Sequence, residues 1–240
     1  DPAEREKDLS LDSKLGFVGF EYENDLIGEI SSSILINEIS SKDFNHYPRY
    51  TLTEHDVSLN KQIANIDIYL EAVLSGTNVN DWENGSKFYA TAFMDLYDYG
   101  ITYEYKNYNL DSHVDIIFPN PPIVFRESSS TLISSNVHAI NWRDEIGHQI
   151  EINKKFSDHF IIQTNTSFSY RHPKEGRANI SLMDILQMDE NLDIHNRYPF
   201  RQTYFEASGW INKGKIYYKI GVDQFDDFKM YNSFPFSVSA

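Results

Sequence analysis

The heptapeptide Ile146-Gly147-His148-Gln149-Ile150-Glu151-Ile152 decides how this sequence is interpreted, because apolar and polar side chains alternate along it. A second alternating run follows at residues 160–170, after a short polar turn. A period of two residues is that of a β-strand with one face in an apolar environment and the other in water. The function therefore depends on whether the apolar faces contact a protein core or a lipid bilayer.

The longest clean alternation covers residues 63–74. We expect one face to carry Ala64, Ile66, Ile68, Leu70, Ala72 and Leu74, and the other to carry Asn65, Asp67, Tyr69 and Glu71. Such a run exceeds the about 5 to 6 residues of most globular strands. It is long enough to cross a bilayer at a tilt, which takes about 9 to 11 residues.

Alternation and turn residues predict a series of antiparallel hairpins and about ten strands in all. The paired segments are residues 15–23 with 29–39, 87–96 with 101–107, 131–141 with 145–153, and 203–212 with 215–223. Residues 160–170 extend the third hairpin, so that consecutive neighbours form a meander. The fold class we expect is all-β: an antiparallel up-and-down meander of long strands that is a transmembrane β-barrel or a large part of one.

Weakly alternating, polar segments are expected to connect these strands. They are residues 40–56, 110–128 and 171–198, and the second contains the donor-poor run Pro119-Asn120-Pro121-Pro122. Residues 225–240 show no obvious closing strand. Short turns alternating with long loops are typical of outer-membrane barrels. We expect a charged N-terminal segment at residues 1–14 and the barrel region at residues 15–240.

Composition excludes several classes of function. The chain has 240 residues, a formal net charge of -15 and no cysteine, which argues against nucleic acid as a partner and excludes disulfides and thiolate chemistry. Aromatic residues make up 15% of the chain. Two explanations fit this content: aromatic girdles at the bilayer interfaces of a membrane barrel, or the general preference of Tyr and Phe for β-strands. No run approaches the about 18 apolar residues of a membrane-spanning helix. Residues 1–5 lack a signal peptide's pattern, so we expect the chain to begin within a mature protein.

One set of motifs carries a family resemblance. These motifs are Tyr103-Glu104-Tyr105-Lys106-Asn107-Tyr108, Asn120-Pro121-Pro122, Arg126-Glu127 and the run from Asp144 to Glu151. In this order, over about the middle third of the chain, they resemble an uncharacterised family of outer-membrane β-barrel proteins from Bacteroidota. The resemblance implies an outer-membrane location and an antiparallel barrel larger than this chain. It supplies no catalytic residues.

Candidate sites in the sequence are weak. His138, His148 and His159 fall near one another in the expected meander but have no metal-ligand spacing. Three acidic groups are more typical of solvated loops than of calcium sites: Asp223, Asp226 and Asp227; Asp189, Glu190 and Asp193; and Asp81 and Glu83 with Asn84. We interpret Arg126-Glu127 as structural, and Trp82 and Trp142 as interface anchors. We therefore assign no catalytic, cofactor or metal residue and expect no cofactor.

Two hypotheses for function follow. The first is an integral outer-membrane β-barrel of a Gram-negative bacterium, in contact with the lipid bilayer and other outer-membrane proteins. It would have a structural, transport or partner-binding role, no chemistry of its own, and an acidic lumen that favours cations. The second is a soluble or surface-exposed β-sandwich that binds carbohydrate through exposed aromatic residues, either as a binding protein alone or as a glycoside hydrolase. Strand length favours the first, because sandwich strands need only about 5 to 6 residues.

Overall fold

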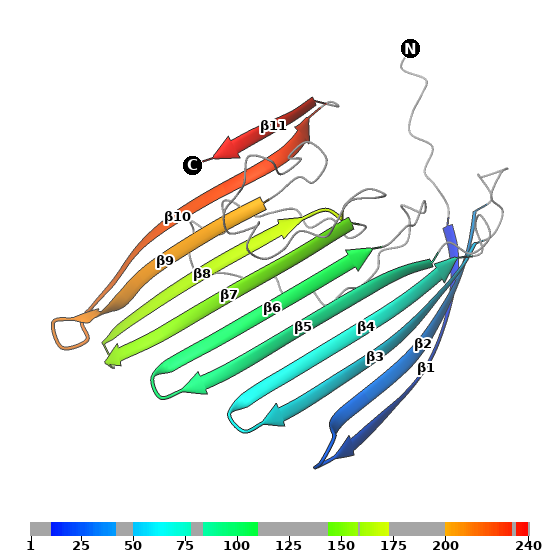
Figure 1. Cartoon of the computed structure of the whole chain (residues 1–240), viewed down its shortest axis with the longest axis horizontal. Coiled ribbons are helices and arrows are strands. Elements are labelled where there is room, and N and C mark those ends of the chain that lie inside the picture. Colours follow the sequence, from blue (N-terminus) through cyan, green and yellow to red (C-terminus); the bar gives the residue numbers. More distant parts are fainter. Residues whose placement is uncertain are drawn as a thin grey trace.

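The structure is a computed structural model, and it describes residues 11–41, 50–77, 84–109, 144–157, 159–172, 200–231 and 234–239. The described residues form eleven strands in a single sheet, in which every strand is hydrogen-bonded to its neighbours in chain order (Figure 1). The strands are β1 (Leu11–Asn24), β2 (Gly28–Ser41), β3 (Tyr50–Ile63), β4 (Ile66–Thr77), β5 (Asn84–Leu96), β6 (Tyr99–Asn109), β7 (Asp144–Ser157), β8 (Phe160–Tyr170), β9 (Phe200–Ile211), β10 (Ile216–Tyr231) and β11 (Phe234–Ser239).

Five short turns lie at one end of the strands, which we call the short-turn rim (Figure 1). They join β1 to β2, β3 to β4, β5 to β6, β7 to β8 and β9 to β10. The tight turns require a positive backbone φ at Ala64 (55°) and Tyr97 (58°), a conformation that residues other than glycine adopt only with some strain. The long connections leave from the opposite end, which we call the long-loop rim. From β1 to β10, short turns alternate with the other connections as predicted, whereas the connection from β10 to β11 spans only residues 232–233.

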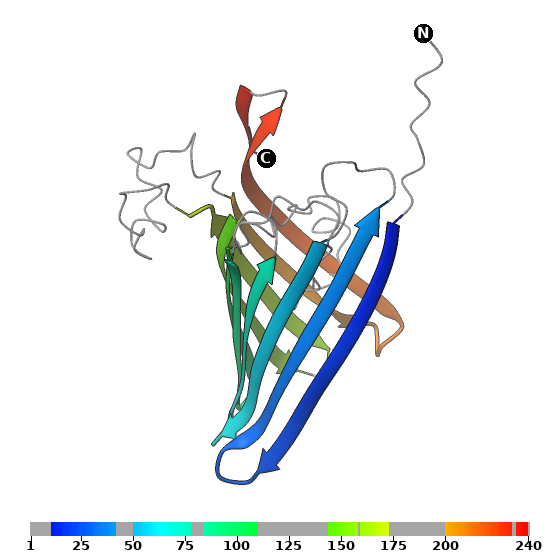
Figure 2. The ribbon, with the colours of Figure 1, turned by 90° about the vertical axis from the view of Figure 1, so that its right-hand side faces the viewer.

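The sheet curves into the wall of an incomplete barrel (Figure 2). Every pairing is antiparallel, and the register holds along whole strands, with one irregularity between Lys155 and Ser157. Within the described residues, β1 and β11 each pair on one side only, so the two edges of the wall are not joined to each other. One sheet in chain order is a meander, and the described strands do not form the two packed sheets of a sandwich.

The predicted meander is confirmed, and the hairpins β1–β2, β5–β6, β7–β8 and β9–β10 have the expected partners. The division at residue 14 stays a prediction, and β1 begins at Leu11.

Four expectations about strands were wrong. Residues 50–56, expected in a connection, belong to β3, and the strand expected from residue 63 begins at Ile66, because a turn at Ala64 and Asn65 separates two alternating runs. Residues 234–239, expected not to form a strand, are β11. Finally, residues 131–141 were expected to pair with residues 145–153. These residues of β7 pair instead with β6 and β8, and residues 131–141 lie outside the described residues.

Candidate functional site

The register sorts the side chains of the sheet into two chemically distinct faces. Partners across an antiparallel ladder point to the same face, and neighbours along a strand point to opposite faces. Glu54, Ser75 and Gly85 share one face, and His55, Leu74 and Ser86 share the other. We name these the polar face and the apolar face. This assignment extends from β1 to β10, with one irregularity between Lys155 and Ser157 near the end of β7.

Acidic side chains dominate the polar face. Those placed there by the register are Glu21, Glu23, Glu29, Glu54, Asp56, Asp67, Glu71, Asp95, Glu104, Glu145, Glu151, Glu206 and Asp223. The lysines of this face are Lys87, Lys106, Lys155 and Lys219. Since carboxylates outnumber these amines, the polar face carries a negative field that attracts cations and repels anions.

Ion pairs tie the lysines of this face to its carboxylates. Lys87 Nζ lies 3.0 Å from Glu54 Oε1, reaching from β5 across β4 to β3, and the Lys87 side chain is only 3% exposed. Lys106 is paired with Glu145, and its stem fills the space beside Gly147, where a Cβ atom would collide with it. Two lysines of the polar face are therefore held by carboxylates of the same face.

Hydrogen bonds link further polar side chains on this face. The Tyr69 hydroxyl donates to Glu71 Oε2 at 2.7 Å, and the Tyr204 hydroxyl donates to Glu206. The Gln202 amide donates to both carboxylate oxygens of Asp223 at 3.0 Å. Tyr204 and Glu206 are buried. Buried polar groups with partners hold fixed positions, so this face presents an ordered polar lining.

The apolar face has the reverse character. Among the described residues of β4, β5, β6 and β8, this face carries no Asp, Glu, Lys or Arg. Over the sheet as a whole, its exposed large side chains include Ile34, Ile36, Val57, Leu74, Phe88, Ile150, Phe205, Ile220 and Val222. Exposed apolar area of this extent marks contact with a membrane or another protein. A lipid bilayer would cover it with apolar chains on every strand at once.

Charged residues on the apolar face stand near the ends of the strands. They are Asp12, Lys14, Glu38, Lys61, Asp144, Lys154, Arg201 and Asp226. On the apolar face of β7, no Asp, Glu, Lys or Arg lies between Asp144 and Lys154. This charge-free run measures about 33 Å at about 3.3 Å per residue. At a tilt of about 45° this run covers about 23 Å, close to the roughly 25 Å apolar band of membrane barrels.

Aromatic side chains flank this charge-free band at both rims. Near the short turns the apolar face carries Tyr22, Tyr99, Phe156, Phe160 and Tyr218. Near the long-loop rim it carries Tyr105, Phe168 and Tyr170, and the latter two pack with Ile146 in a buried cluster. Two aromatic girdles around an apolar band are the pattern of a transmembrane barrel.

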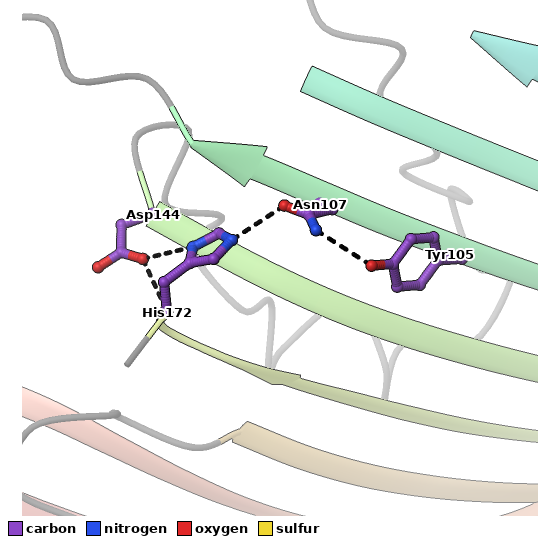
Figure 3. A network of polar contacts seen from close by, with 4 residues as sticks. All are labelled: Tyr105, Asn107, Asp144 and His172. Atoms are coloured by element: carbon purple, nitrogen blue, oxygen red, sulfur yellow. Dashed lines mark hydrogen bonds and ion pairs between the residues drawn. The ribbon is translucent and has the colours of Figure 1, made fainter. Parts of the chain in front are cut away.

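A polar network ends the apolar face at the long-loop rim (Figure 3). The His172 backbone N–H donates to Asp144 Oδ1 at 2.7 Å, and the His172 ring nitrogen Nδ1 lies 2.8 Å from the same oxygen. Its Nε2 lies 2.9 Å from Asn107 Oδ1, and the Asn107 amide donates to the Tyr105 hydroxyl at 3.1 Å. The network joins β6, β7 and the residues after β8 at the level where lipid headgroups would lie.

Of the three histidines considered in the sequence, the structure describes His148 and His159. His148 lies on β7, where its Nδ1 is 2.8 Å from the Tyr103 hydroxyl and its ring is 4.9 Å from that of Tyr105. His159 lies in the turn after β7, and His138 lies outside the described residues. Among the residues that the structure describes, no group of three or more metal-ligating side chains forms.

The acidic group expected in a loop near the C-terminus lies within β10 instead, which corrects that expectation. The alternation of the strand sends Asp223 to the polar face, where it accepts hydrogen bonds from Gln202, and Asp226 to the apolar face, where it pairs with Arg201 at 2.8 Å. The other residues considered lie outside the described residues, except Asn84, which begins β5: Asp81, Trp82, Glu83, Arg126, Glu127, Trp142, Asp189, Glu190 and Asp193.

No family model and no curated protein matches this chain. Solved structures with a similar course of the chain include two proteins of Pseudomonas aeruginosa. One is OccK5 (OpdH), with a TM-score of 0.43, 11% identity, and coverage of 98% of this chain and 63% of that chain. The other is the outer membrane protein OprD, with a TM-score of 0.39, 11% identity, and coverage of 95% and 65%.

The chain therefore spans less than two thirds of either neighbour. Both TM-scores are low, so the fold is assigned from the strand order and register given above. It is an all-β antiparallel meander. Among the described residues there is no helix with the length and apolar character needed to cross a membrane.

Proposed function

We propose that this chain forms the wall of an integral β-barrel in the outer membrane of a Gram-negative bacterium, with its polar face toward a lumen. The observation that carries the proposal is the separation of the two faces: one is acidic and ordered, and the other is apolar, with exposed side chains on most strands, and is bounded by charged and aromatic rims. Only a bilayer offers this apolar face a matching solvent along its whole length.

The role that best fits this wall is passage of small solutes. Acidic side chains line the polar face from β1 to β10, so the lumen would favour cations over anions. The wall would act through its field and its shape, with no chemistry of its own. Membership of the Bacteroidota family that the sequence resembles, and association with other outer-membrane proteins, belong to the same proposal.

Cysteine labelling on β5 tests the proposal, because the chain has no native cysteine and β5 alternates small side chains between the faces. Ala90 and Ala92 lie on the apolar face, and Thr91 between them lies on the polar face. Each is changed to cysteine in turn, and the protein in outer-membrane vesicles is exposed to a charged, membrane-impermeant maleimide. We expect Thr91→Cys to be labelled and Ala90→Cys and Ala92→Cys to be protected.

Two controls accompany the labelling. Unboiled samples should migrate differently from boiled ones on a gel, and the protein should stay in the membrane pellet after a carbonate wash. Equal labelling of the three cysteines in protein that carbonate releases would contradict the proposal.

A further inference from the structure

The short-turn rim has an uneven distribution of charge. Around the turn from β1 to β2 it is acidic, with Glu23, Asp25 and Glu29, and the nearby Lys61 donates to the backbone oxygen of Asp25 at 2.6 Å. Around the turns from β5 to β10 the described residues include Lys154, Lys155, Lys213 and Lys215, together with Asp95 and Asp98. We define the basic rim as Lys154, Lys213 and Lys215.

The three turns of this basic part are neighbours in space. The Lys155 backbone N–H donates to the Asp98 carbonyl at 3.0 Å, and the Trp210 N–H donates to the His159 carbonyl at 2.9 Å. These bonds join the β5–β6 turn to β7, and the β7–β8 turn to β9. The lysines of the basic rim therefore stand along one continuous edge of the wall.

Lys154 has the setting of a cation at a membrane interface. It lies on the apolar face, with its Nζ 3.6 Å from the centroid of the Tyr99 ring and 5.7 Å from that of Phe156. Phe156 is stacked on Phe160, with 5.3 Å between ring centroids. The carboxylate paired with Lys154 Nζ is that of Asp98, at 3.7 Å. Because Asp98 is 67% exposed, this ion pair is weak. A cation held by aromatic rings can still attract a phosphate.

Lys213 and Lys215 present their side chains from the tip of the β9–β10 turn. Both are exposed, and Lys213 has a φ of 55°, a conformation that glycine or asparagine adopts more readily. The strands on either side add the exposed apolar side chains Ile211 and Ile216, which the register places on the apolar face. Exposed lysines beside such residues match the boundary between lipid headgroups and acyl chains.

We infer that the basic rim, together with Tyr99 and the aromatic residues beside it, binds the phosphates of anionic phospholipid headgroups in the leaflet that faces the short turns. The inference rests on the proposed function, since it requires the apolar face to lie in a bilayer. Charge complementarity supports it: the chain has a net charge of -15, yet this edge of the wall concentrates lysines. Binding would fix the depth and tilt of β7–β10 in the membrane.

The test uses the full chain refolded in neutral detergent. Native mass spectrometry gives the binding constant for dioleoylphosphatidylglycerol relative to dioleoylphosphatidylcholine. The test variant is Lys213→Gln/Lys215→Gln, which changes exposed turn side chains. The matched control is Lys14→Gln/Lys61→Gln, which removes the same charge from the apolar face of β1 and β3. Lys154→Gln is measured separately.

We expect the wild-type chain to prefer phosphatidylglycerol, and the preference to fall by about 25-fold in Lys213→Gln/Lys215→Gln, since each interfacial lysine contributes about fivefold. The control should keep the wild-type preference, and Lys154→Gln should lower it by about fivefold. Equal binding of the two lipids by the wild-type chain, or an equal loss in the control, would overturn the inference.

Two further measurements separate the causes of failure. If inorganic phosphate alone binds to the basic rim and abolishes the lipid preference, the rim binds free phosphate, and the lipid inference is wrong. The gel shift between boiled and unboiled samples is recorded for every variant. A wild-type chain that shows the shift without the lipid preference loses only this inference, whereas a chain without the shift also loses the proposed function.

Discussion

The polar and apolar faces of this sheet differ in a way that reverses the rule for water-soluble proteins. On the polar face, Lys87 is 3% exposed, while on the apolar face Leu74 is 63% exposed. Both lie in adjacent, hydrogen-bonded strands. Charged residues are rarely buried in a soluble domain unless they are paired, and extended apolar surface is rarely left exposed. The reversal supports the proposal that the polar face lies in water and the apolar face lies in a bilayer.

The difference between the faces also extends to geometry. Ion pairs and hydrogen bonds order the polar face, and Glu54 and Lys87 contact each other across an intervening strand. On the apolar face, polar contacts occur chiefly toward the rims, as in the Asp144–His172–Asn107 network. The bilayer hypothesis therefore makes position along the strand as important as the face on which a residue lies.

The largest expected effect comes from a charge placed in the middle of the apolar face. Ala90→Arg puts a guanidinium opposite Leu70, and we expect it to destabilise the membrane-inserted form by about 2–4 kcal/mol. Thr91→Arg places the same group on the polar face of the same strand and should cost less than about 1 kcal/mol. Urea titration of folding into lipid vesicles measures both. Equal costs would mean that the two faces share one solvent.

A smaller effect is expected from the buried ion pair of the polar face. Lys87→Met keeps the apolar stem but leaves Glu54 without its partner at 3.0 Å, and we expect a loss of about 3 kcal/mol, at the low end for buried pairs because Glu54 is 17% exposed. Arg201→Met breaks a more exposed pair with Asp226 and should cost less than about 1 kcal/mol. The same titration compares them, and similar losses would show that water reaches Lys87 freely.

Much of this comparison could be predicted from the sequence, because the period of a strand assigns faces without reference to its partners. The positions from Ile66 to Leu74 separate as expected, with Asp67, Tyr69 and Glu71 opposite the aliphatic residues. The error at residues 63 and 64 came from the turn. Ala64 adopts positive φ, and nothing in its chemistry distinguishes it from an apolar strand residue.

Contacts between strands far apart in the sequence could not be predicted. Asn107 and His172 are 65 positions apart, and they meet only because β6, β7 and β8 are consecutive in the sheet. The same is true of Lys154 and Tyr99, where register alone brings the ammonium over the ring. Alternation predicts the face of each residue, but it leaves open which residues of that face come within hydrogen-bond distance.

The polar network at the long-loop rim should contribute a modest amount of stability. Asn107→Ala removes one bond to His172 and one to Tyr105, and we expect a cost of about 1–2 kcal/mol. Asn109→Ala, the next position of the same face on β6, is exposed and serves as the control. Folding midpoints in urea decide between them. If both variants behaved alike, the network would be too well solvated to stabilise this rim.

The smallest effect concerns ion selectivity, which tests the polar face directly. Asp67 and Asp95 are exposed on this face near the short turns. A carboxylate about 8 Å from a passing ion in water changes its free energy by about 0.5 kcal/mol, roughly twofold in local cation concentration. We therefore expect Asp67→Asn/Asp95→Asn to lower the permeability ratio of potassium to chloride by about two- to fourfold in planar bilayers. Glu38→Gln, on the apolar face, should leave the ratio unchanged.

The difference in permeability ratio between the unaltered protein and Asp67→Asn/Asp95→Asn should shrink as salt is raised, because the Debye length falls from about 10 Å at 0.1 M to about 3 Å at 1 M. A ratio that favours chloride in the unaltered protein would show that the acidic face does not line the path of the ions.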